Sequence, residues 1–295
     1  LFDVLVCTTI IQPGIDMPTV NTLVADRADR LGLGQLHQLR GRVGRAGQRA
    51  YAYLLFPPDR TLTEEAYERL RTIGAGWMTV GSRNMMHPLG LERLRGLGYE
   101  DGVLLVSNHR SFFDLYMLML LLHRHTPRRQ PWMCPVRADF FYQSAAGVVV
   151  NLLIGGGRMF PPFFREPQKA EFNKWALERV VHELHKGRVL VGFHPEGTRN
   201  KNDDPYTPLP AQPGVGKLVM ENWPKVVPAF INGLSNDIIA DVRGNFAGTK
   251  RVVAVFGEPI DLTPFQKMGN RLSSHKRIAD ALLKRIYELG EEERS

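Results

Sequence analysis

Two short polar runs each follow an apolar segment, and both contain residue types that handle protons or anions. The first run is Asn-His-Arg-Ser-Phe-Phe-Asp, residues 108–114, directly after the apolar stretch Val103 to Val106. Its histidine falls where an expected strand ends, and its aspartate falls in the first turn of an expected helix. At this spacing the Asp114 carboxylate can orient the His109 imidazole as a general base for a hydroxyl.

Helix capping offers a second interpretation of the same run. Ser111 followed three residues later by Asp114 fits a capping box, in which each side chain bonds to the backbone of the other. Capping accounts for Ser111 and Asp114 but gives no reason for Asn108 and His109. Both interpretations stay open on this run alone.

The second run is Phe-His-Pro-Glu-Gly-Thr-Arg, residues 193–199, at the end of an expected strand over residues 188–193. Ligands bind at the carboxyl ends of strands in open α/β sheets. Gly197 lets the backbone approach a ligand, while Thr198 and Arg199 offer a hydroxyl and a fork of donors suited to phosphate. The alternative is a simple turn that closes the strand and leaves Arg199 in solvent.

Strands alternate with helices after residue 90, which predicts an α/β sandwich. Gly90 to Leu94 has the pattern of a lead-in strand, and Trp132 to Arg137 that of a later one. Pro167 suits the start of a helix with an apolar stripe at Phe172, Ala176, Val180 and Leu184. Further strands are expected over 225–231 and 251–257, and further helices over 214–222 and from Ser274.

The bulk properties favour a reducing compartment and an anionic partner. The 295 residues include only two cysteines, Cys7 and Cys134, which lack metal-ligand spacing. The net charge is +8, and residues 1–74 contribute little of it, with nine Arg against eight Asp or Glu. A basic remainder suits nucleic acid, phosphorylated substrates or an anionic membrane surface.

No segment has the length and apolarity of a transmembrane helix. The aromatics Phe160, Phe163 and Phe164 stand beside arginines, which fits either docking on an anionic bilayer or packing in the core. The chain shows no signal peptide, and its start at Leu1 suggests a fragment.

Four runs in order resemble the glycerolphosphate acyltransferase family, in particular the 1-acylglycerol-3-phosphate acyltransferases. They lie at residues 108–114, 159–165, 193–199 and 226–229, and the resemblance covers roughly residues 80–290. The chain departs from the family pattern where His194 is inserted before Pro195, in the second run, and at Gln212-Pro213-Gly214. These departures concern the acyl acceptor more than the reaction.

The resemblance implies an O-acyltransferase of phospholipid synthesis, with His109 as the base and Asp114 as its orienting partner. It implies that Arg165, Thr198 and Arg199 hold the phosphate of a lysophospholipid, while Glu196 and Gly197 shape the pocket. The favoured acceptor is 1-acylglycerol-3-phosphate, and the donor is acyl-CoA or an acyl-carrier protein. We expect no cofactor and no metal, and a peripheral or monotopic location on the cytoplasmic face of the membrane.

The first quarter of the chain carries a different resemblance. Thr8 to Asp16 and Gln38 to Arg45 resemble motifs V and VI of superfamily-2 helicases, most closely the transcription-repair coupling factors. The resemblance implies part of a RecA-like domain in which Gln38, Arg42 and Arg45 face a nucleotide, the two arginines as arginine fingers.

The rest of the nucleotide machinery is absent from these 295 residues. They contain neither the Gly-x-x-x-x-Gly-Lys-Ser/Thr loop nor an Asp-Glu pair to hold magnesium, and Gln12-Pro13 departs from the usual Glu-Thr. We therefore expect no ATP hydrolysis and do not expect nucleic acid as a partner.

Three parts are predicted: a truncated helicase-like fragment over residues 1–74, a junction over 75–89, and an acyltransferase-like domain over 90–295. The leading hypothesis is a membrane-associated acyltransferase. The alternative is a DNA-repair helicase fragment without ATPase activity, joined to the second part by gene fusion or misassembly.

Overall fold

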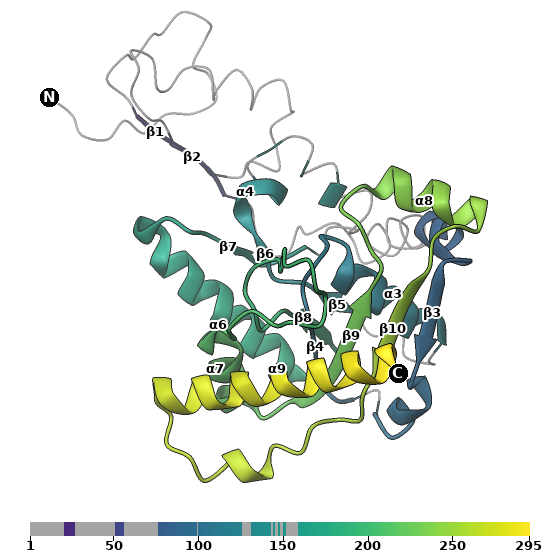
Figure 1. Cartoon of the computed structure of the whole chain (residues 1–295). Coiled ribbons are helices and arrows are strands. Elements are labelled where there is room, and N and C mark those ends of the chain that lie inside the picture. The colour runs from purple at the N-terminus through teal and green to yellow at the C-terminus, as the bar shows by residue number, and fades with distance from the viewer. Residues whose placement is uncertain are drawn as a thin grey trace, which may run out of the picture. The chain divides into compact units, whose positions relative to one another are not determined.

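The computed structural model describes residues 21–26, 51–55, 76–98, 100–125, 131–142, 144, 147, 150–151 and 159–295. The chain divides into two units, Leu1–Ala66 and Tyr67–Ser295 (Figure 1). The predicted boundary at residue 74 stays a prediction. The nucleotide-facing residues expected in the first part, Gln38, Arg42 and Arg45, lie outside the described residues.

The described part of the first unit is a pair of strands. β1 (Thr22–Ala25) and β2 (Tyr51–Leu54) are hydrogen-bonded in parallel, with Thr22 opposite Tyr51. Parallel neighbours need a long crossover connection, and 25 residues separate these two strands, as the α/β pattern of a RecA-like domain requires.

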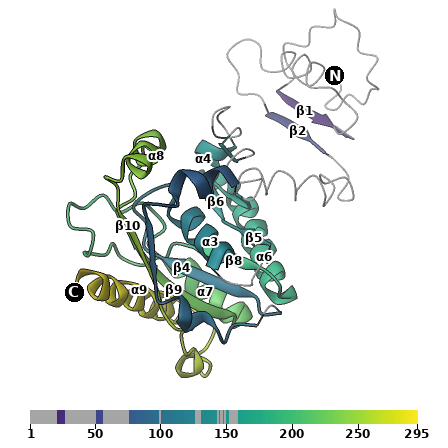
Figure 2. The same cartoon turned by 90° about the vertical axis from the view of Figure 1, so that its right-hand side faces the viewer.

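A six-stranded sheet forms the centre of the second unit (Figure 2). Its strand order is β3-β10-β9-β4-β8-β5, and every neighbouring pair is parallel except β9 with β10. The strands are β3 (Met86–Leu89), β4 (Val103–Ser107), β5 (Trp132–Met133), β8 (Leu190–Phe193), β9 (Lys225–Asn232) and β10 (Val252–Phe256). The predicted α/β class is confirmed.

Helices cover both faces of this sheet, which explains why its central strands are apolar throughout rather than alternating. In β4, Val103 and Leu105 belong to one apolar core with α3 (Asp114–His125). Leu104 and Val106 belong to the other core, with α6, α7 and α9. These helices span Ala170–Lys186, Pro213–Asn222 and Leu272–Arg294, and α8 (Ile238–Ala247) follows β9.

The expected lead-in strand at Gly90 to Leu94 was wrong. Leu91–Leu94 form the 3-10 helix η3, and the edge strand is β3, which lies inside the segment expected to be a junction. Gly90 explains the turn between them, because it has φ of 74° and a Cβ there would lie 2.1 Å from the Phe256 carbonyl oxygen.

The expected strand from Trp132 to Arg137 was also wrong in extent. Pro135 has no N–H to donate to a ladder, and the segment breaks around it. β5 ends at Met133, and β6 (Val136–Arg137) instead pairs in parallel with β7 (Pro162–Phe163).

The apolar stripe predicted for α6 is confirmed only in part, because Phe172 is exposed while Ala176, Val180 and Leu184 are buried. Among the described residues, none of the helices has the length and apolarity to cross a membrane.

Candidate active site

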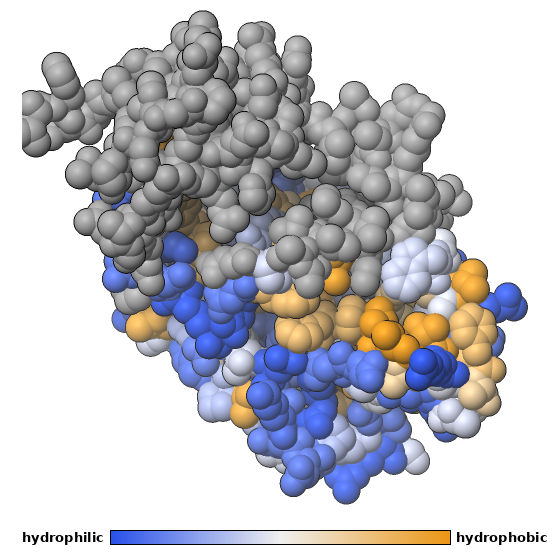
Figure 3. Space-filling view, turned by 90° about the horizontal axis from the view of Figure 1, so that it is seen from above, coloured by the Kyte–Doolittle hydropathy of each residue, from blue (hydrophilic) through white to orange (hydrophobic). Residues whose placement is uncertain are grey.

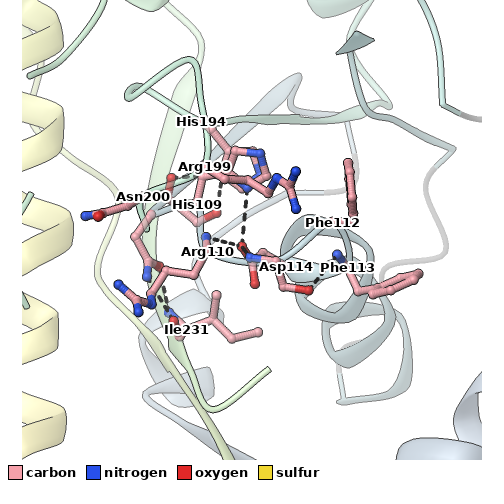
Figure 4. A network of polar contacts seen from close by, with 12 residues as sticks. His109, Arg110, Phe112, Phe113, Asp114, His194, Arg199, Asn200 and Ile231 are labelled. Atoms are coloured by element: carbon pink, nitrogen blue, oxygen red, sulfur yellow. Dashed lines mark hydrogen bonds and ion pairs between the residues drawn. The ribbon is translucent and has the colours of Figure 1, made fainter. Parts of the chain in front are cut away.

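His109 and Asp114 lie at the end of β4 and the start of α3, as the sequence predicted. The His109 Nδ1 atom is 3.3 Å from Asp114 Oδ2 (Figure 4). The same oxygen accepts hydrogen bonds from the backbone N–H groups of Arg110 and Ser111, each at 2.7 Å. The Asp114 side chain is 1% exposed and that of His109 is 18% exposed. Asp114 therefore reaches back to the backbone and orients the imidazole at once, which unites the two interpretations of this run.

These contacts determine the protonation of the pair. A carboxylate accepts hydrogen bonds, so Nδ1 of His109 carries the ring proton and Nε2 keeps its lone pair. Burial, together with the positive charge of Arg199, lowers the pKa of His109 to about 3. Burial raises the pKa of Asp114 to about 6. At neutral pH the pair is a neutral imidazole held by a carboxylate, the form that a general base requires.

The sheet brings the second polar run beside the first. β4 and β8 are parallel neighbours with Val106 opposite Phe193, so the residues that follow each strand meet at the same edge. Glu196, which is 1% exposed, accepts a hydrogen bond at Oε2 from the His109 N–H at 2.9 Å. Its Oε1 accepts from the Tyr287 hydroxyl at 2.9 Å and the Leu209 N–H at 3.0 Å. Glu196 thus fixes the backbone that carries His109.

The three residues after Glu196 surround the open side of this edge. Gly197 has φ of 67°, and both Gly197 and Thr198 are exposed. The Arg199 guanidinium lies over the Phe112 ring, 3.9 Å from its centroid. Stacking and hydrogen bonding to the protein leave part of the guanidinium for an anion.

Arg165 is positioned by another element. It follows β7, where the Asn173 side chain of α6 bonds both the N–H and the carbonyl of Phe164 at 2.8 Å. Arg165 is exposed, and within the described part of the chain no hydrogen bond or ion pair joins it to His109 or Arg199. Its phosphate-binding role stays a prediction.

Asn108 has a structural role that the sequence did not reveal. Its side-chain amide donates to the Ile231 carbonyl and accepts from the Ile231 N–H, each at 2.9 Å. The amide replaces a backbone partner where β4 ends and ties this end to β9. Helix capping gave no reason for an asparagine at position 108, whereas its two hydrogen bonds to Ile231 do.

His194, which the sequence indicated only as an insertion in the family pattern, lies beside His109. Its ring stacks on that of His109, with centroids 3.8 Å apart and an angle of 9° between the planes (Figure 4). Its Nδ1 lies 3.1 Å from the Ser107 carbonyl oxygen, so this nitrogen carries the proton. The position of His194 directly after β8 could have indicated this contact, because β8 ends beside the end of β4.

The cluster of His109, Asp114 and His194 also contains potential metal ligands. Nitrogen and oxygen atoms of His109, Asp114 and His194 lie within 4.8 Å of one another, a donor set that suits zinc. The lone pairs of the two imidazoles lie in planes that are almost parallel and 3.8 Å apart between centroids, so they do not converge on one ion. The arrangement suits proton transfer better than metal binding.

Comparison with known proteins gives separate matches for the two parts of the chain, as the sequence motifs predicted. Residues 88–232 match the acyltransferase family, and residues 1–47 match the helicase conserved C-terminal domain. The crystal structure of the 1-acyl-sn-glycerophosphate (LPA) acyltransferase from Thermotoga maritima is 16% identical, covers 79% of this chain and 83% of its own, and has a TM-score of 0.46.

Curated relatives support the helicase-like resemblance of the first part of the chain. The transcription-repair-coupling factor of Escherichia coli is 58% identical over 120 residues, and that of Mycobacterium tuberculosis is 48% identical over 129 residues. These matches cover 40% and 39% of this chain, more than the quarter that the motifs indicated, but only 10% of each relative. The resemblance to both families is confirmed: residues 88–232 match the acyltransferase family, and residues 1–47 match the helicase conserved C-terminal domain.

Proposed function

We propose that the chain transfers a fatty acyl group from a thioester to the hydroxyl of a lysophospholipid, with 1-acylglycerol-3-phosphate as the favoured acceptor. The observation that supports this most directly is the neutral His109 imidazole, held at Nδ1 by Asp114, with Arg199 nearby. A base for a hydroxyl and a cation for a phosphate then occupy one edge of the sheet.

The reaction needs only the residues already described and the two substrates. His109 Nε2 takes the proton of the acceptor hydroxyl while its oxygen attacks the thioester carbon. The carbon–sulfur bond breaks, and the thiolate leaves with the proton returned by the imidazolium. Asp114 stabilises the imidazolium in between. Arg165, Thr198 and Arg199 bind the acceptor phosphate, while Glu196 and Gly197 shape the pocket, and acyl-CoA or an acyl-carrier protein supplies the thioester.

The surface around this edge supports an interfacial location. Phe112 and Phe140 are 39% and 37% exposed and their rings are stacked, while Ile239 and Phe246 of α8 are 61% and 64% exposed. Figure 3 shows apolar residues gathered among hydrophilic ones on the face seen from above. We propose that this surface contacts an anionic bilayer on its cytoplasmic side, where the acceptor lies.

The aromatics expected at the membrane have a mixed environment. Phe160, Phe163 and Phe164 are partly buried. Phe160 and Phe164 contact the rings of Trp175 and Phe172, which are each 50% exposed. These aromatics therefore support α6 and leave apolar surface at the same time.

The test is thioester consumption by the full chain with a panel of lysolipids, measured as thiol release and as phospholipid formed. We expect turnover with 1-acylglycerol-3-phosphate, and His109→Ala should lower it by about 10²–10⁴-fold. A His109→Ala chain that keeps wild-type turnover would exclude the mechanism. Sedimentation with anionic and with neutral vesicles tests the location, because Ile239→Ser with Phe246→Ser should release the chain only if α8 contacts lipid.

A further inference from the structure

One residue outside the motifs contacts both polar runs of the site. The Asn236 Oδ1 atom accepts a hydrogen bond from Arg199 Nη1 at 3.0 Å and another from the Phe112 N–H at 3.2 Å. Asn236 lies between β9 and α8, after residue 232, where the match to the acyltransferase family ends. No sequence motif indicated this residue.

The loop that carries Asn236 is anchored on both sides. The Ser111 hydroxyl donates to the Ser235 carbonyl at 2.5 Å. The Asp241 carboxylate, 3% exposed, accepts from the Ser235 N–H at 3.0 Å and from its hydroxyl at 2.8 Å, and forms an ion pair with Lys250 at 2.6 Å. The position of Asn236 is therefore built into the fold although its side chain is exposed.

Two contacts together fix the plane of the Arg199 guanidinium. Its face lies against Phe112, and one of its N–H groups bonds to Asn236. The remaining N–H groups point away from both partners in a fixed fork, the geometry that phosphate accepts.

The amide of Asn236 must present its oxygen to these two donors, so its NH₂ group faces the other way. No hydrogen bond occupies that NH₂ group within the described part of the chain. It is a further donor beside the free edge of Arg199.

We propose that Asn236 belongs to the acceptor-phosphate site, where it positions the Arg199 guanidinium and donates from Nδ2 to the same phosphate. This inference rests on the proposed function, because it assigns a phosphorylated acceptor to that site. It adds a residue that takes part in acceptor recognition but not in proton transfer.

The experiment compares Asn236→Asp and Asn236→Ala with the wild-type full chain. The carboxylate of Asn236→Asp repels phosphate and loses the donor, so KM for 1-acylglycerol-3-phosphate should rise about tenfold or more while kcat stays within about threefold. Asn236→Ala should raise KM less. With monoacylglycerol, which has no phosphate, neither variant should change KM relative to wild type.

Gln266→Glu is the matched control, because it makes the same amide-to-carboxylate change at an exposed position after the 3-10 helix η5 (Thr263–Phe265). It should leave both KM values unchanged. Calorimetric binding of glycerol 3-phosphate provides a readout without turnover, and Asn236→Asp should weaken it by a similar factor.

The outcomes separate the two proposals. If wild type acylates lysolipids but Asn236→Asp keeps the wild-type KM and glycerol 3-phosphate affinity, the role of Asn236 is overturned. If wild type acylates none of them but binds glycerol 3-phosphate through Asn236, the proposed function fails and the phosphate site stands. If wild type neither acylates them nor binds glycerol 3-phosphate, both are overturned.

Discussion

The helicase-like part and the acyltransferase part differ in how closely they resemble known proteins and in whether their predicted site residues have partners within this chain. The first has relatives that are 48–58% identical, but the chain spans only about a tenth of their length. Its two arginines are predicted to act on a nucleotide for which these 295 residues contain no phosphate loop. The second matches the acyltransferase family over residues 88–232, and its His109, Asp114, Glu196 and Arg199 lie together at one edge of the sheet.

The comparison shows that high identity over a segment does not by itself supply a site, because chemistry needs side chains that converge. High similarity over a short segment can preserve residues whose partners lie elsewhere. Substitutions at four sites test whether activity and the stability of the site depend on the second part alone. They are given from the largest expected effect to the smallest.

Asp114→Asn should reduce kcat by about 10³–10⁴-fold, because an amide favours the wrong imidazole tautomer and cannot stabilise the imidazolium. The pH profile of kcat/KM adds a second check. Asp114 has its pKa raised to about 6 by burial and must be ionised, so wild-type activity should fall as pH drops below about 6. A wild-type profile that is flat down to pH about 4 would contradict this role for Asp114.

Glu196→Ala should lower the free energy of unfolding by about 3 kcal/mol, since it leaves the partly buried N–H groups of His109 and Leu209 without their acceptor. Urea denaturation followed by circular dichroism measures the change. Glu196→Gln keeps one oxygen acceptor and should cost less. Equal stability of the alanine variant and wild type would show that water replaces the carboxylate.

His194→Ala should reduce kcat by about tenfold or more, because the His109 ring loses the face that holds it. Removal of this ring also exposes His109 to water, so the pKa of His109 should rise towards its ordinary value. His194→Phe keeps the stack and should restore most of the activity. The idea is wrong if the alanine and phenylalanine variants have the same kcat.

Arg42→Ala with Arg45→Ala should leave acyl transfer unchanged, since their predicted role concerns a nucleotide. The measurement is kcat/KM for thioester consumption by the full-length double variant, with ATP hydrolysis assayed alongside. A fall in acyl transfer at wild-type stability would show that the first part contributes to the activity of the second.

Local sequence determined much of the acyltransferase part. Continuous apolar runs such as Val103 to Val106 predicted buried strands, because a strand covered on both faces needs no polar side. His109 and Asp114 are five residues apart, so one strand-to-helix corner suffices to bring them together. Where a single proline or glycine redirects the backbone, as at Pro135 and Gly90, the apolar pattern misled.

Tertiary structure decided which distant residues complete the site. Glu196 bonds to His109 across 87 positions, and Asn236 bonds to Arg199 across 37. Both contacts depend on β8 and β9 lying on either side of β4, and on their register. Apolar strands of similar composition can pair in several orders, so no local pattern specifies these neighbours. The sequence by itself determined that His109 and Asp114 share one strand-to-helix corner, and the order of the strands decided what surrounds them.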